Sequence, residues 1–275
     1  MRARRECGLQ LARGVALASV IAAAACGDDI TNVNSEVPSF TPNAIVSYDD
    51  LKAALVEAVG TNSAGTNGGL GLPMWATVVD RSGVVVAVVY SGTAEDDQWP
   101  GSRVISAQKA NTANNFSLDG LALSTANLYS ATQPGGSLFG LQEANPINFD
   151  AAYGGATDEY GTTDDYMVGK KIGGTNVFGG GFALYDASGQ IIGAVGVSGD
   201  TSCADHVIGW KVRHGLNLDN VPGGVSATGD DNIVYDIDAA GTSAGGFGQP
   251  HCADATTEST IAADLPVTFP VGAAE

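Results

Sequence analysis

The spacing of apolar positions predicts a mixed domain that begins with a helix after residue 46. Between Ser47, placed to cap the helix, and Gly60, placed to end it, apolar residues follow the i, i+3, i+4 spacing. This stripe comprises Leu51, Ala54, Leu55, Ala58 and Val59. The spacing indicates a helix with one buried face.

Two β-branched runs follow, at 73–80 and 84–90, and a short polar turn joins them. They predict an antiparallel hairpin, and their near-continuous apolar character predicts a sheet covered on both faces. Residues 102–116, with Ser102 as cap, and residues 121–130 are predicted to be helices.

A second hairpin and a further helix are predicted near residue 180. Phe182–Tyr185 is expected to form one strand and Gln190–Val197 the returning strand. Gly193 and Gly196 inside that strand predict a bend or a close approach of another backbone. Ser202 is expected to cap the helix that follows.

Two long segments lack a clear period. Residues 141–176 are predicted to be a loop insertion, and residues 217–275 a C-terminal segment that wraps the domain, with one strand at 233–237. The acidic pairs at 158–159 and 164–165 could bind a cation. Their spacing does not match a calcium loop, so solvated surface is the favoured interpretation.

The N-terminus resembles a targeting segment. Residues 1–25 combine arginines with a short apolar run, as in a signal peptide, and a small-residue run ends at Cys26. The favoured interpretation is a lipoprotein with lipidated Cys26 and a tether over 26–46; an ordinary cleaved signal peptide is the alternative. The protein is therefore predicted to be exported to the periplasm or outer cell envelope, with the lipid as its only membrane attachment.

Charge and cysteine content narrow the possible partners. The formal net charge of -18 argues against nucleic acid, whose phosphates would be repelled, and favours high solubility. With Cys7 in the signal and Cys26 lipidated, Cys203 and Cys252 remain, and in an oxidising compartment they are predicted to form a disulfide. Two buried free thiols are the alternative.

Four blocks carry a resemblance to a known family. They are VVDRSGVVVAVV at 78–89, KANTA at 109–113, GGG at 179–181 and IIGAVGVSGDTSCAD at 191–205. In this order they resemble the GlcG/HbpS-like haem-binding (haem-degrading domain) family over about residues 47–216. The resemblance implies an α/β (α+β), profilin-like fold with a five-stranded antiparallel sheet flanked by helices. It also implies a homo-oligomer and non-covalent haem or a related small ligand.

The candidate haem residues lie in the matched KANTA block and about one and a half turns before it on the same predicted helix. Thr112 is the expected weak oxygen ligand, Lys109 lies on the same helical face, and Arg103 is the candidate partner of a propionate. The alternative is that these side chains cap, pair or pack within the fold. No C-x-x-C-H sequence is present, which excludes covalent attachment of haem at such a motif.

Other chemistry has less support in the sequence. The predicted disulfide would bring His206 towards His251, a candidate transition-metal pair with Asp205 or Asp254 as third ligand. The turn at 197–199 could hold an anion at a helix N-terminus, although a purely structural turn is favoured. No familiar catalytic motif is present. A cofactor-free oligomeric accessory protein and an enzyme of unrecognised type are the remaining alternatives.

Overall fold

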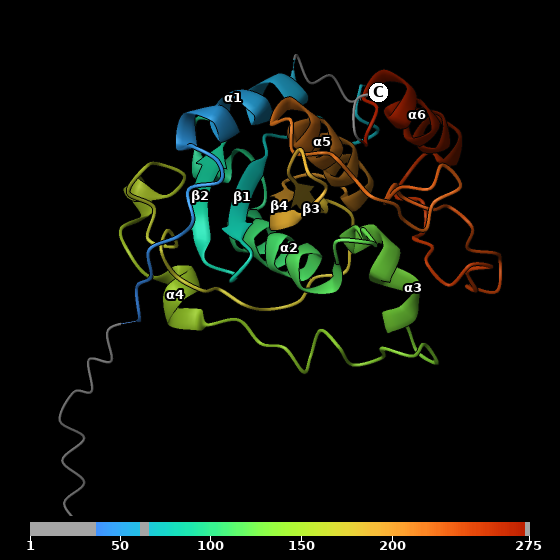
Figure 1. The fold of residues 1–275 in the computed structure, drawn as a ribbon, viewed down its shortest axis with the longest axis horizontal. Coiled ribbons are helices and arrows are strands. Elements are labelled where there is room, and N and C mark those ends of the chain that lie inside the picture. The colour runs from blue at the N-terminus through green and yellow to red at the C-terminus, as the bar shows by residue number, and fades with distance from the viewer. Residues whose placement is uncertain (1–36, 61–65, 273–275) are drawn as a thin grey trace, which may run out of the picture. The chain divides into compact units, whose positions relative to one another are not determined.

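The computed structural model describes residues 37–60 and 66–272, and the predicted signal segment and Cys26 lie outside them. A single sheet of four strands lies at the centre of the described part (Figure 1). The strands are β1 (Trp75–Asp80), β2 (Val85–Tyr90), β3 (Gly181–Tyr185) and β4 (Ile191–Ser198). Their order is β2-β1-β4-β3, and all three pairings are antiparallel.

Helices cover both faces of the sheet, as the apolar strands predict. The helix α2 (Ser102–Phe116) lies on one face, and α1 (Tyr48–Val59) and α5 (Ser202–Gly215) lie on the other (Figure 1). Alternate residues of β1 divide between the layers: Trp75 packs on the α2 side, whereas Ala76 packs on the side of α1 and α5. This alternation follows from the two-residue period of a strand.

Glycine sets the distance between α2 and the sheet. A Cβ atom on Gly196 would collide with the backbone of α2 at Ser106 and Ala110. A Cβ atom on Gly193 would collide with the carbonyl of Val79 in the neighbouring strand. The predicted close approach is therefore confirmed, and it brings the side chains of α2 close to the end of β4.

The expectation of five strands is wrong, because both sheet edges are occupied by short irregular contacts. The edge of β2 pairs through Val85 with the backbones of Gly169 and Lys170, which belong to the 141–176 insertion. The edge of β3 pairs through Tyr185 with Leu218. The strand predicted at 233–237 is also wrong, since this segment contributes only one isolated bridge, from Ile237.

The helices differ from the predictions mainly at their ends. Ser47 caps α1 as predicted, by accepting the Asp50 N–H. Ser102 and Ser202 are instead the first helical residues, after Gly101 and Thr201. The helix predicted at 121–130 is replaced by a 3-10 turn, η2 (Thr125–Leu128), and the short α3 (Tyr129–Thr132). The other short elements are η1 (Glu95–Asp97), α4 (Phe149–Tyr153) and η3 (Thr157–Glu159).

The C-terminal segment contains a helix that its sequence pattern did not predict, α6 (Ala255–Thr268). This helix has few buried residues and contains Pro266, so its apolar period is weak. It packs beside α5, where the Trp210 indole donates to the carbonyl of Phe269. The segment therefore runs back along the domain and adds to its core.

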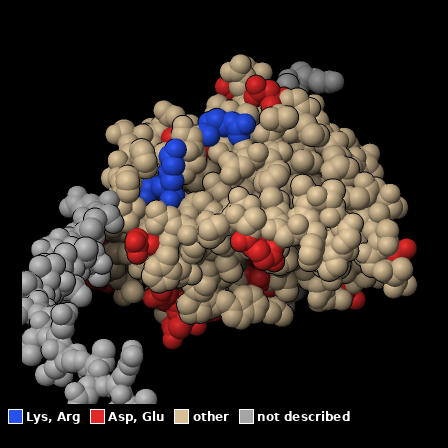
Figure 2. All heavy atoms as spheres, turned by 90° about the horizontal axis from the view of Figure 1, so that it is seen from below, with Lys and Arg blue, Asp and Glu red and all other residues tan. Residues whose placement is uncertain are grey.

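The described surface is sparsely charged and carries both signs. On the face in Figure 2 the basic side chains gather in one small area, while acidic side chains are spread over other parts. Within residues 37–60 and 66–272, no helix is long and apolar enough to cross a membrane.

Candidate functional site

A surface hollow of about 390 Å³ lies where α2, the end of β4 and the start of α5 meet. We call it the Lys109 hollow. Its lining residues are Trp99, Ser102, Ile105, Lys109, Asn176, Phe178, Ser198, Asp200, Ser202 and Asp205. Most of the lining area is apolar, with charged and polar groups at the base, which is the usual make-up of a small-molecule site.

A buried ion pair lies at the base of this hollow. Lys109 Nζ is 2.6 Å from Asp205 Oδ2 and also donates to the carbonyl of Val197 at 3.2 Å. Burial lowers the pKa of the Lys109 ammonium, although Asp205 acts against that shift. Burial raises the pKa of Asp205 to about 6, and Lys109 limits the rise. The pair joins α2 to α5 across the end of β4.

The turn before α5 does not offer an anion site, which agrees with the favoured structural interpretation. The N–H groups of Gly199 and Asp200 both donate to Asp205 Oδ1. The Asp200 carboxylate in turn accepts N–H groups from Thr201 and from residues 70–72. These amides are already satisfied within the protein, so an incoming anion would have to displace a carboxylate.

Arg103 lies in a different environment from Lys109. Its guanidinium makes a two-pronged contact with Asp165, at 2.9 Å from Nε and 2.5 Å from Nη2, and it stacks on Tyr160. Asp165 is fully buried, so the expectation of solvated surface is wrong for this residue; Asp158, Glu159 and Asp164 are exposed. Arg103 therefore fastens the insertion to α2 and does not line the hollow.

Thr112 is also occupied within the fold. Its hydroxyl donates to the carbonyl of Gln108 at 2.7 Å and accepts the N–H of Asn176 at 2.9 Å. The side chain is fully buried and does not line the Lys109 hollow. Of the three candidate haem residues, only Lys109 lies at the hollow.

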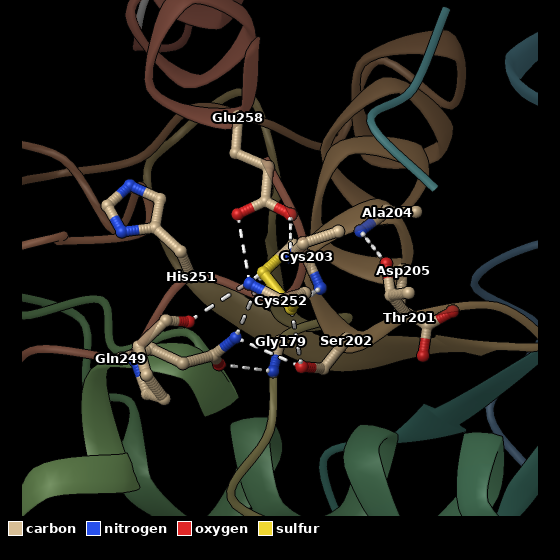
Figure 3. The surroundings of a disulfide bond; sticks show 12 residues. Gly179, Thr201, Ser202, Cys203, Ala204, Asp205, Gln249, His251, Cys252 and Glu258 are labelled. Atoms are coloured by element: carbon tan, nitrogen blue, oxygen red, sulfur yellow. Dashed lines mark hydrogen bonds between the residues drawn. A yellow bond between two sulfur atoms is a disulfide. The ribbon is translucent and has the colours of Figure 1, made fainter. Parts of the chain in front are cut away.

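The predicted disulfide is confirmed, since the sulfur atoms of Cys203 and Cys252 are 2.05 Å apart. It ties the C-terminal segment to the start of α5 (Figure 3), next to Ser202, which lines the hollow. Gln249 donates to the Ser202 hydroxyl at 3.1 Å and accepts the N–H of Gly179 at 2.8 Å. Gly179 follows Phe178, so the C-terminal segment links two walls of the hollow.

The two histidines proposed as a metal pair have separate partners. His206 is fully buried on α5, and its Nε2 accepts the N–H of Ile233. The ring of His251 stacks on Tyr235 and extends away from the sulfur atoms in Figure 3. Asp205 is engaged with Lys109. Within the described residues, the side chains that could form a three-ligand metal group are Cys203, Cys252 and Glu258, which include neither histidine and are partly consumed by the disulfide.

Sequence reasoning missed most of the hollow. Trp99 and Phe178, which form its apolar walls, come from irregular segments with no period. In the structure, what marks these two large rings is their exposure to solvent, which is 51% for Trp99 and 39% for Phe178. Sequence alone does not reveal exposure outside regular elements.

Comparison with solved structures finds distant similarities, three of which follow. A Klebsiella pneumoniae protein, ORFY, is 24% identical over 62% of this chain and 90% of its own, with a TM-score of 0.40. A PduOC:haem complex is 23% identical over 63% of this chain and 96% of its own, with a TM-score of 0.41. HbpS is 16% identical over 65% of this chain and 92% of its own, with a TM-score of 0.36. No curated protein matches the sequence.

The family model described as "Haem degrading protein HbpS-like" matches residues 50–212. The matched region includes all four strands, α2 and most of α5, and the whole lining of the Lys109 hollow. Because the model spans more than half of the sequence, this chain belongs to the HbpS-like family of haem-degrading proteins.

Proposed function

We propose that this protein binds haem, or a related small ligand, in the Lys109 hollow. The observation that carries the proposal is a hollow of ligand size with apolar walls and a buried ion pair at its base, inside the family domain. Trp99, Ile105 and Phe178 supply the apolar contacts. The hydrophobic gain from covering them would drive binding.

The lining suits the faces of the haem macrocycle but not its iron or its propionates. The apolar walls suit the faces of the macrocycle. None of the described lining residues is a histidine, cysteine, methionine or tyrosine, which are the side chains that usually ligate haem iron. Arg103 and Lys109 already have carboxylate partners, so neither is a ready partner for a propionate. The proposal is therefore binding through apolar contacts, without a strong iron ligand from this hollow.

Titration with haemin tests the proposal. We expect a saturable Soret shift at micromolar haemin. Phe178→Ala should weaken binding about tenfold through lost apolar contact. Absence of a saturable shift in the wild-type protein would exclude haem.

Two control variants separate this hollow from other sites. Phe139→Ala removes an equally large ring that is more exposed, at 66%, and does not line the hollow, so haemin affinity should not change. Thr112→Ala should change the affinity little, since Thr112 does not line the hollow and supports it only through its bond to the Asn176 N–H. A large loss of affinity in Thr112→Ala with an intact fold would instead support the ligand role that the motif match suggests.

We also propose export and lipid anchoring at Cys26, together with assembly into a homo-oligomer. The N-terminal sequence pattern supports the first and the family resemblance supports the second. Intact mass of the membrane fraction, compared with Cys26→Ser, would test the anchor. Sedimentation of the soluble domain would test the assembly.

A further inference from the structure

The base of the Lys109 hollow carries hydrogen-bond donors that the fold does not use. The hydroxyls of Ser102 and Ser198 and the side-chain NH₂ of Asn176 have no hydrogen-bond partner among the described residues. The three residues are only 2%, 4% and 8% exposed. We call these three residues, with Lys109, the polar floor.

These polar atoms reach the opening of the hollow, since none of them is among the fully enclosed, unpartnered polar atoms of the described residues. A ligand that covers them must supply hydrogen bonds, because a polar group left unpaired on burial costs free energy. Lys109 adds to the set, since an ammonium has three donors and only two are used, by Val197 and Asp205. The polar floor thus offers donors from three parts of the chain, namely α2, β4 and the loop before β3, to whatever occupies the hollow.

The charges around the polar floor decide which acceptor it suits. Lys109 and Asp205 form a neutral pair overall, whichever of them holds the proton. Asp200 also lines the hollow, and its carboxylate makes the local formal charge negative. A ligand carboxylate would meet this negative charge in a poorly solvated site, whereas an uncharged carbonyl would not.

We propose that the polar floor is a subsite for an uncharged carbonyl group, such as the amide or ring carbonyl of a flat, apolar ligand. This proposal rests on the proposed function, because it concerns the same hollow, and it specifies the chemical group that would bind at the base. Serine hydroxyls and an asparagine amide donate to a carbonyl oxygen without requiring a charge on it. The apolar walls would hold the ring that carries the carbonyl.

A matched pair of probes tests the subsite without haem. Benzamide and benzoate have the same ring and differ mainly in the charge of the polar group. Binding is followed by Trp99 emission and by calorimetry on the full domain. We expect benzamide to bind about tenfold more tightly than benzoate, from the charge difference and the hydrogen bonds that the floor supplies.

The Ser198→Ala variant tests whether the Ser198 hydroxyl donates a hydrogen bond to the ligand carbonyl. Because the Ser198 hydroxyl has no partner among the described residues, its removal should leave the thermal unfolding temperature unchanged. The affinity for benzamide should fall about fivefold, and that for benzoate should change less. Ser188→Ala, in an exposed turn where the hydroxyl contacts Asp186, is the matched control and should change neither affinity.

The outcomes distinguish the subsite from haem binding. If benzoate binds as tightly as benzamide, if Ser198→Ala binds benzamide like the wild type, or if benzamide fails to bind at millimolar concentration, the carbonyl subsite is excluded, whatever haemin does. If benzamide binds as expected and haemin does not, the subsite is supported and only the haem proposal fails. Haemin dimethyl ester, which lacks the free carboxylates, should bind at least as tightly as haemin; weaker binding of the ester would count against the subsite.

Discussion

The two cations of α2 lie six residues apart and have opposite environments. Arg103 is covered by the insertion, where Asp165 takes two of its donors and Tyr160 covers its face. Lys109 is paired with Asp205 but faces a hollow, beside polar groups that lack partners among the described residues. The comparison shows that burial of a charge does not identify a site. What distinguishes the functional candidate is unused hydrogen-bonding capacity next to an opening.

The largest expected effect comes from the disulfide, which ties the C-terminal segment to the first turn of α5, beside the Lys109 hollow. Cys203→Ala/Cys252→Ala should lower the free energy of unfolding by about 4 kcal/mol in the chain-entropy model, because the closed loop spans 49 residues. Chemical denaturation of this variant and the wild type measures the loss.

The same double variant also tests whether the C-terminal segment shapes the hollow. Gln249 should be held less firmly against Ser202 and Gly179, so haemin affinity should fall as well. Thermal unfolding in the presence and absence of haemin measures both the stability of the variant and its haemin affinity. Unchanged affinity, with lowered stability, would show that the C-terminal segment does not shape the hollow.

The next effect concerns the Arg103 end of α2. Asp165→Ala should destabilise the domain by about 3 kcal/mol, because it leaves a buried guanidinium without its carboxylate. The expected cost is at the lower end for such a pair, since Arg103 keeps its bond to the carbonyl of Ala152. Urea denaturation measures it, with exposed Asp164→Ala as the matched control.

Ligand binding by Asp165→Ala tests whether Arg103 and Lys109 have different roles. If Arg103 only fastens the insertion, Asp165→Ala should bind haemin and benzamide like the wild type under conditions where it is folded. A selective loss of haemin affinity would mean that the insertion contributes to the ligand site.

The smallest expected effect is a pH dependence at His206, the neighbour of Asp205 on α5. Burial lowers the pKa of His206 to about 3, against about 6.5 in the unfolded chain. Below about pH 6.5 the unfolded state therefore binds a proton that the folded state does not. Stability from this residue is present at pH 7 and is lost as pH falls towards 3, by about 2 kcal/mol between pH 7 and pH 5.

Denaturation at several pH values tests this prediction. His206→Gln should lose most of this pH dependence, whereas exposed His251→Gln should retain it. Equal pH profiles for the wild type and His206→Gln would contradict the prediction. The comparison between variants matters because Asp205, whose pKa is raised to about 6, contributes in the opposite direction between about pH 4 and pH 6.

Local periodicity predicted most of the longer regular elements of this protein, with α6 as the exception. The four strands, α1, α2 and α5 follow from apolar spacing that a few neighbouring residues specify. The close approach at Gly196 followed from the absence of a side chain, and the pairing of Cys203 with Cys252 from a count of two remaining cysteines. Each of these inferences needs only local sequence or simple elimination. The fifth strand was not local: it came from a family resemblance, and irregular segments occupy the edges where it would pair.

Tertiary structure alone decided the partners of the charged residues. Lys109 pairs with a residue 96 positions away and Arg103 with one 62 positions away, and nothing in either local sequence distinguishes their fates. The walls of the hollow come from Trp99 and Phe178, which lie in segments without a period. Sequence thus determined where the strands, α1, α2 and α5 form, because these elements depend on near neighbours. The site depends on which distant side chains meet after packing, and on which donors that packing leaves unused.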